Sequence, residues 1–520
     1  MRKIMGSKPL ETTHLITAGL KLNRTVVALT CLLVMLGATY GQKVNPRQPE
    51  TEKPPKQESG KEKSQLPDRP IEIVNVINEA NSAPPEFAAD ILIRLAQSSK
   101  ISDVAWKREI ITDAFRLASK SDQKLKRTYF GTVMDTREGY LGLALAQNLD
   151  TLSLQLRAVT AMLAVDKARA REMFSEISPD LKIPPLTCSD ALVPDVSDFY
   201  AVMKRVADET LGSDEAREGA ALWFVQPYVQ AINSPAQVAP VAKAIDGLKL
   251  PADQFAIVLR SFTESLKRIS GDYRTFSSAA LRDSLTQSFV DLANQCDRLN
   301  VPKQELLQAV RGYLLRGFGS TQCADRSVSQ SKPLPGFIVG LNRDLLKGAP
   351  VSFEDIQPTI IGESPQTIAF WESSRSKDIL NRLRRLRFRS DGKARTDDEK
   401  TSPEWQQQLS DFLTDLDTWS VADEKSDVDY FHEKAITYRV LSDILPSGLM
   451  RDRIWRNNAS FLADGYLPHN RIEWFMHASH FLDRVKGLKG KDRADLITIF
   501  SSSRNNVLRS YAYLNDVVRD

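Results

Sequence analysis

The sequence predicts an all-α protein whose helices stack as an irregular helical-repeat α-solenoid or superhelix. Apolar residues recur at steps of three and four, as one face of a helix requires. The clearest stripe consists of Leu281, Leu285, Phe289, Leu292, Cys296 and Leu299. Alternating patterns typical of strands are scarce, and the best candidates, 337–339 and 359–361, are short. No fixed repeat period with recurring signature positions is present, so two or three separate helical bundles are the alternative.

Residues 1–41 have the features of a secretory signal peptide. Basic residues precede a largely apolar run from Val26 to Ala38, and small residues at 39–41 suit cleavage before Gln42. Thirteen residues of helix cover about 20 Å, less than the ~30 Å hydrocarbon core of a bilayer. We therefore expect a periplasmic or secreted protein. The alternative is an uncleaved N-terminal segment that anchors the chain.

Residues 42–70 should form a disordered linker. They hold six prolines, no aromatic residue and many Lys, Glu and Gln, so they cannot bury enough apolar surface to offset the entropy of ordering. Cleavage at residue 41 would remove five basic residues and one acidic residue, which leaves 65 of each sign. A neutral mature chain does not favour a nucleic acid as a partner.

The rest of the chain should consist of helix pairs. Ser234-Pro235-Ala236-Gln237 has the elements of a capping box. The clearest pairs are 86–97 with 105–118, and 152–164 with 167–177. Polar or proline-rich interruptions divide this part into helical repeat blocks at 71–187 and 188–330, a connector with a basic helix at 331–390, a charged loop at 391–400 and a C-terminal helical block at 401–520.

Three cysteines follow the predicted signal peptide. Cys296 lies on the apolar stripe and should be a buried free thiol. Cys188 and Cys323 both lie in interruptions, at the two ends of one helical block, and we expect them to form a disulfide in an oxidising compartment. The sequence contains no Cys-x-x-Cys, which argues against dithiol redox chemistry and ribbon-type zinc sites.

One local cluster has the residue types of a metal site. Glu473, His477 and His480 fall within one arc of a helix, and two imidazoles one turn apart with a carboxylate could bind a divalent metal. His432 and Glu433 could complete the ligand shell from another helix. The solvated polar face of an amphipathic helix would give the same pattern, and no His-Glu-x-x-His is present.

A basic stretch at 377–395 is a candidate surface-binding segment. Arg384, Arg385 and Arg387 are interleaved with leucines, so this helix could lie on anionic lipid, on the cell wall or on a partner. A core-packed helix with a charged outer face is the alternative.

Motifs for catalysis and for cofactors are missing. The sequence has no phosphate-binding Gly-x-x-x-x-Gly-Lys and no Gly-x-Ser-x-Gly. We therefore expect a non-enzymatic scaffold that binds a protein partner in the cell envelope or periplasm and needs no cofactor. The alternatives are a metal-binding protein or hydrolase that uses His477 and His480, and an envelope factor that contacts anionic lipid or cell wall through 377–395.

Overall fold

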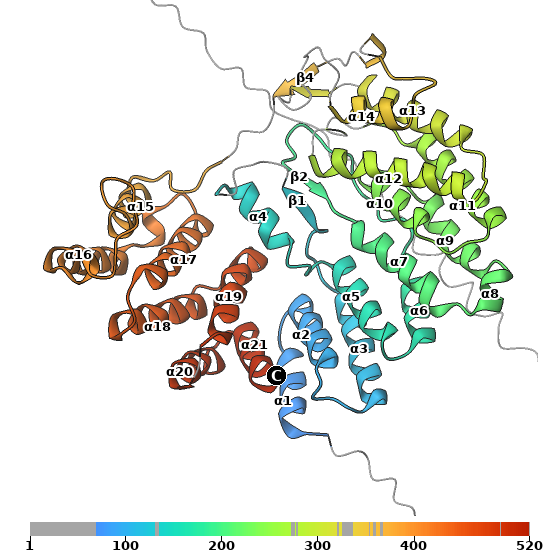
Figure 1. The fold of residues 1–520 in the computed structure, drawn as a ribbon. Coiled ribbons are helices and arrows are strands. Elements are labelled where there is room, and N and C mark those ends of the chain that lie inside the picture. Colours follow the sequence, from blue (N-terminus) through green and yellow to red (C-terminus); the bar gives the residue numbers. More distant parts are fainter. Residues whose placement is uncertain are drawn as a thin grey trace, which may run out of the picture. The chain divides into compact units, whose positions relative to one another are not determined.

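Helices form almost all of the regular structure in the computed structural model (Figure 1). The structure describes residues 69–129, 135–271, 276, 279–319, 322–324, 336–352, 354–356, 360–363, 368–488 and 490–518. The predicted signal peptide and all but the last two residues of the predicted linker lie outside these ranges. Within them the all-α prediction is confirmed, and no helix is both long and apolar enough to cross a membrane.

The first half of the chain contains α1 (Ile71–Ala80), α2 (Pro85–Gln97), α3 (Val104–Ala118), α4 (Arg137–Leu145), α5 (Thr151–Leu163), α6 (Lys167–Ser175), α7 (Ser197–Thr210), α8 (Ser213–Arg217), α9 (Ala220–Gln230), α10 (Pro235–Asp246) and α11 (Ala252–Arg268). The second half contains α12 (Ala279–Arg298), α13 (Gln304–Gly319), α14 (Gly336–Asp344), α15 (Ser374–Arg387), α16 (Pro403–Thr418), α17 (Asp427–Ile444), α18 (Leu449–Asp464), α19 (Arg471–Lys486), α20 (Gly490–Ser501) and α21 (Asn506–Val517). Three short 3-10 turns lie at Glu354–Ile356, Glu399–Thr401 and Val421–Asp423.

Side-chain caps set the starts of many helices. The hydroxyl of Ser234 accepts from the backbone of α10, and Gln237 accepts from the backbone N–H of Ser234, so the predicted capping box is confirmed. Asp150 caps α5 and Asp166 caps α6 in the same way. Each cap satisfies amide groups that the first turn of a helix leaves without a partner.

The helices of the first two-thirds of the chain contact one another in two series. In one series α2, α5, α7, α10, α12 and α14 each contact the next (Figure 1). In the other, α9 contacts α11 and α11 contacts α13. The predicted pairs α2 with α3 and α5 with α6 are also in contact.

Hydrogen bonds show that α9 and α11 run in the same direction. Gln226 donates to Ser261 across 3.2 Å, 35 residues along the chain. Ser265 donates to the carbonyl of Val229 across 3.0 Å, 36 residues away. The nearly constant offset means that one intervening helix brings the chain back to the same direction in this series.

The C-terminal helices pack against the N-terminal ones. Helix α21 contacts α1 and α2, and α19 contacts α4. The ring of Phe87 lies 4.8 Å from Phe475 and 6.5 Å from Tyr511, in edge-on geometries that aromatic pairs favour. One apolar core therefore includes residues from both ends of the described chain.

A second apolar core holds α15, α16 and α17 together. Its largest side chains are Trp371, Trp405 and Trp419, which are 6%, 1% and 2% exposed. Tyr140 of α4 belongs to this second core, although the helix that carries it also packs on α19. The whole of Asp68–Asp520 forms one unit by its internal contacts, and the finer division into four blocks stays a prediction.

Strands are few and short in the described ranges. Strand β1 (Arg127–Tyr129) pairs antiparallel with β2 (Leu192–Pro194), and β3 (Gln322–Ala324) pairs parallel with β4 (Ile360–Glu363). The expectation of a strand at 359–361 is therefore met by β4. The expectation at 337–339 is wrong: these residues lie in α14, where Ile338 and Leu341 are buried at helical spacing.

Cys188 and Cys323 form a disulfide, the pairing expected from the sequence. Cys323 lies in β3, so the bond ties the loop after α6 to the strand that follows α13. Cys296 is a free thiol and is fully buried in α12, where burial raises its pKa to about 11.

Reduction of the disulfide should lower the free energy of unfolding. The bond closes a loop of 135 residues, and the chain-entropy model gives about 5 kcal/mol for a loop of that length, an upper value because natural bonds deliver 0–5 kcal/mol. Urea unfolding with and without a thiol reductant measures the difference. The Cys188→Ser variant should unfold at the reduced midpoint in both conditions, and equal midpoints for the oxidised and reduced natural chain would contradict the prediction.

Candidate functional site

The three predicted metal ligands lie on α19 but in different surroundings. His477 is buried at 7% exposure, Glu473 is half-buried and His480 is exposed. Among the residues that the structure describes, no group of three or more His, Cys, Asp or Glu is placed to hold a metal ion. The metal site therefore gains no support. The alternative of a solvated polar face also fails for His477, because this side chain points into the protein.

His477 instead meets two other polar rings in the interior. Its ring centroid lies 5.1 Å from Tyr140 and 5.3 Å from His432, and the centroids of Tyr140 and His432 are 3.9 Å apart. Phe370 stacks on His432 at 3.8 Å. We call Tyr140, His432, Glu433, Glu473 and His477 the junction cluster, because it lies where α4, α17 and α19 meet.

Backbone hydrogen bonds connect the segment 368–371 to the helices of this cluster. The N–H of Arg137, at the start of α4, donates to the carbonyl of Ile368 across 3.0 Å, and Thr136 forms a β-bridge with Ala369. Trp371 then has a φ of 63°, in the left-handed region that non-glycine residues rarely adopt. Its N–H donates to the carboxylate of Glu433. The segment 368–371 is thus fixed to both α4 and α17, and it places Phe370 on His432.

Several polar atoms of the cluster have no hydrogen-bond partner among the described residues. They are the Tyr140 hydroxyl, both ring nitrogens of His432, Oε2 of Glu433 and Nε2 of His477. Next to them Arg137 pairs with Asp429, and Asp135 lies 3.7 Å from the Nε2 of His432. A buried polar atom without a partner costs about 1–3 kcal/mol, so such a concentration is expensive for a purely structural core.

Burial controls the protonation of this cluster. It lowers the pKa of His432, and it lowers the pKa of His477 well below the ordinary range, with repulsion from His432 adding to the effect. Burial also raises the pKa of Glu433 to about 8 and that of Glu473 to about 7. Near neutral pH the imidazoles are therefore neutral, and the two carboxyl groups carry protons for a large part of the time.

Acid should destabilise the protein through the buried imidazole of His477. The unfolded chain takes up a proton there near pH 6.5, whereas the folded chain keeps the ring neutral. Between pH 7 and pH 5 this removes up to about 2 kcal/mol of unfolding free energy. Urea unfolding at several pH values should show a smaller acid-induced loss for His477→Phe than for the natural chain. Parallel pH profiles would contradict this assignment.

Glu473 should act in the opposite direction. Its carboxyl binds a proton in the folded chain up to a pH of about 7 but loses it near its ordinary pKa when unfolded, so stability falls as the pH rises between these values. The Glu473→Gln variant keeps a neutral side chain at every pH. Its unfolding free energy should therefore fall less between pH 5 and pH 8 than that of the natural chain in the same titration.

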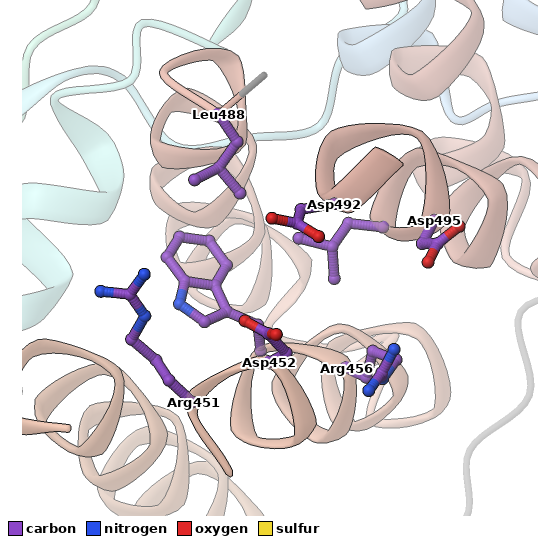
Figure 2. Close-up of a pocket in the computed structure, with 8 residues that line it drawn as sticks. Arg451, Asp452, Arg456, Leu488, Asp492 and Asp495 are labelled. Atoms are coloured by element: carbon purple, nitrogen blue, oxygen red, sulfur yellow. The ribbon is translucent and has the colours of Figure 1, made fainter. Parts of the chain in front are cut away.

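A pocket of a different kind lies between α18 and α20. It encloses about 40 Å³, and its apolar lining comes from Trp455, Leu488 and Leu496. Figure 2 shows Asp492 and Asp495 on the α20 side, facing the charged side chains of α18. The ring of Phe481 lies 5.3 Å from Trp455, and the guanidinium of Arg484 lies over the indole at 4.9 Å. The contacts with Phe481 and Arg484 therefore fix the orientation of the Trp455 indole.

Charged side chains of both signs surround this pocket. Its lining includes five charged residues: Arg451, Asp452, Arg456, Asp492 and Asp495. Within the described ranges none of these five forms an ion pair. Leu449 lies one turn before Asp452 on α18 and is 86% exposed. The pocket thus combines an aromatic ring with charged side chains that form no ion pair in the described ranges, and an exposed leucine lies one turn away on α18.

Helix α15 carries the predicted basic surface. Its apolar side packs through Ile379, Leu383 and Leu386, which are buried in the second core. Arg384, Arg385 and Arg387 are exposed, and in the part of the chain that the structure describes they form no ion pair. The helix is thus packed in the core on one side and cationic on the other.

Sequence patterns pointed to only part of the candidate sites. The sequence pattern indicates four residues of the junction cluster as potential metal ligands: His432, Glu433, Glu473 and His477. Tyr140 is not indicated, because a tyrosine within Gly139–Leu145 is also an ordinary core residue at helical spacing. Trp455 gave no signal, since the charged residues around it on α18 read as a solvated helix face.

Comparison of the chain with protein-family models, with curated proteins and with solved structures returns no match.

Proposed function

We propose that this chain is an exported, non-enzymatic helical-repeat protein that binds a protein partner through the surface around the Trp455 pocket. The observation that carries the proposal is that surface: an 86% exposed Leu449 beside a Trp-floored pocket whose five charged lining side chains are unpaired among the described residues.

The packing of the helices supports an α-solenoid. Two series of helices run along the chain, and α9 and α11 repeat the same direction at an offset of 35–36 residues. Stacks of this kind bury a continuous core between neighbouring repeats and leave long surfaces free for binding. The irregular helix lengths explain why the sequence has no fixed period.

Export is supported by the predicted signal peptide and by the cysteines. A disulfide between Cys188 and Cys323 needs an oxidising compartment to persist. The periplasm or the outside of the cell meets this requirement.

A binding role fits the chemistry of the polar groups better than a catalytic one. In the junction cluster Tyr140, His432, Glu433 and His477 are each 7% exposed or less. A general acid or base must come within hydrogen-bond reach of its substrate, and these groups lie under aromatic rings. The Trp455 pocket, in contrast, opens to solvent and holds groups suited to recognition.

The partner should be recovered from envelope fractions by the tagged natural chain and lost with Leu449→Ser. Removal of an exposed anchor residue should weaken binding at least tenfold, which corresponds to about 1.4 kcal/mol. The measurement is crosslinking in cells, affinity capture and then titration of the purified partner.

Two variants serve as controls for exposed apolar residues elsewhere. Val104 is 54% exposed on α3 and Trp223 is 70% exposed on α9. Val104→Ser and Trp223→Ser should bind the partner as the natural chain does. Loss of binding only in Trp223→Ser would place the partner on α9. If affinity capture recovers the tagged chain without any other protein, the proposal of partner binding is contradicted.

Envelope association through α15 is a second candidate function, favoured by the three exposed arginines without ion pairs in the described ranges. Vesicles that contain anionic lipid should sediment the natural chain at low salt, and reversal of Arg384, Arg385 and Arg387 to Glu should abolish this. The matched control reverses the exposed Lys100, Lys249 and Lys347. Equal sedimentation of both triple variants would rule out α15 as the contact.

A further inference from the structure

A polar groove lies where the two ends of the described chain meet. Its inner part encloses about 120 Å³ and is lined by groups of α2, α19, α21 and the loop between α4 and α5, among them Arg94, Ser479, Lys486 and Asn515. An outer part of about 730 Å³ continues from Arg94, Lys486 and Asn515 to Arg493 of α20. Three cationic side chains from three helices therefore line one continuous space.

Arg94 is held in place from behind by a buried carboxylate. Its Nε donates to Asp90 across 2.8 Å, and the Asp90 side chain is completely buried. Arg157 also pairs with Asp90, and the Tyr511 hydroxyl donates to it. Burial alone would raise the pKa of Asp90, but Arg157 and Arg94 lower it below its ordinary value, so the carboxylate stays ionised. The Arg94 side chain is still 45% exposed and presents its remaining N–H groups to the groove.

The other groups of the groove add donors and positive charge. Lys486 is 45% exposed and pairs with the exposed Asp483 across 2.7 Å. Arg493 donates weakly to the carbonyl of Asn515 across 3.4 Å, and its Nε has no partner among the described residues. The lining of the groove thus holds three cations, Arg94, Lys486 and Arg493, and one carboxylate, Asp483.

We infer that this groove binds an oxyanion, a carboxylate or phosphate group carried by a larger molecule, with Arg94 as the fixed anchor and Lys486 and Arg493 as further cationic contacts. An arginine oriented by a buried carboxylate is prepared for the two parallel hydrogen bonds that carboxylates and phosphates accept. The outer space, which Arg94, Lys486 and Arg493 all line, receives the anionic group, and the inner space beside Ser479 receives another part of the molecule. The site is distinct from the Trp455 pocket and does not depend on the proposed partner.

The ligand would also connect the two ends of the fold. Arg94 belongs to α2, whereas Lys486 and Arg493 belong to α19 and α20. An anion shared between them adds contacts across the interface of α21 with α1 and α2. Binding should therefore stabilise α21 more than helices far from the groove, such as α16.

Titration calorimetry of the full chain with pyrophosphate and with citrate tests the site and separates its two chemistries. We expect binding of at least one of these ions, and binding at least tenfold weaker in the double variant Lys486→Gln/Arg493→Gln. Lys249→Gln/Lys347→Gln, at exposed positions outside the lining of the groove, is the matched control and should bind as the natural chain does. Binding of pyrophosphate alone assigns a phosphate site, and binding of citrate alone assigns a carboxylate site.

A second measurement keeps the inference testable without disturbing the groove. Hydrogen exchange of the amides of α21 should slow in the presence of the ion that binds, and exchange in α16 should not change. Arg94→Lys keeps the positive charge but loses the planar guanidinium that can donate two parallel hydrogen bonds, so it should weaken binding. The Lys486→Gln/Arg493→Gln variant should remain folded. No binding of either ion, or an effect that sodium chloride at the same ionic strength reproduces, overturns the inference.

Discussion

The packing of α19 between α4 and α17 is the interaction on which the candidate sites depend. Its buried side chains, Phe475, His477 and Phe481 among them, must find neighbours on several sides at once. Phe475 packs on Phe87 and Tyr511, which ties the C-terminal helices to α2 and α21. His477 packs on Tyr140 and His432 on the other side. Because one helix serves all these contacts, the junction cluster and the oxyanion groove have the same structural origin.

Three carboxylates are buried where elements far apart in the sequence meet. The contacts between the two ends of the chain are made by elements far apart in sequence, and Asp90, Glu86 and Glu433 are each at most 1% exposed there. A buried carboxylate is tolerated only if it is paired or protonated. Asp90 and Glu86 have arginine partners, Arg157 and Arg471 respectively, whereas Glu433 has a backbone donor and a raised pKa. Removal of one partner from such a pair costs more than the pair contributes, so these groups favour one specific joining of the two ends.

The sequence was informative wherever the chain signals its structure locally. Capping by Ser234 with Gln237, the stripe through Cys296 and the pairs α2–α3 and α5–α6 depend on residues within a turn or two of one another. The expected pairing of Cys188 with Cys323 needed only the position of each cysteine relative to a helical block. His477 shows the limit of this reasoning. Helical periodicity places it on the polar arc of α19 with Glu473 and His480, but α19 is covered on more than one side, so part of the polar arc is buried. Periodicity reports one apolar face and cannot reveal a second covering helix. Tyr140 was beyond prediction for the same reason, since its partners His432 and His477 lie hundreds of residues away.

Helix α20 links the two proposed binding sites. Asp492 and Asp495 line the Trp455 pocket, whereas Arg493, on another side of the helix, lines the oxyanion groove. Two of its side chains, Leu496 and Phe500, are buried in the core, and the helix packs on α18 and α21. A ligand bound to both Arg493 and Arg94 would add a contact between α20 and α2. This contact would help to fix the positions of Asp492 and Asp495, the acidic side of the Trp455 pocket. Occupancy of the groove would then alter the affinity for the partner, and by linkage the partner would alter the affinity for the anion by the same factor. If both ligands bind, α20 is the element through which the two sites would be coupled, because it carries lining residues of each.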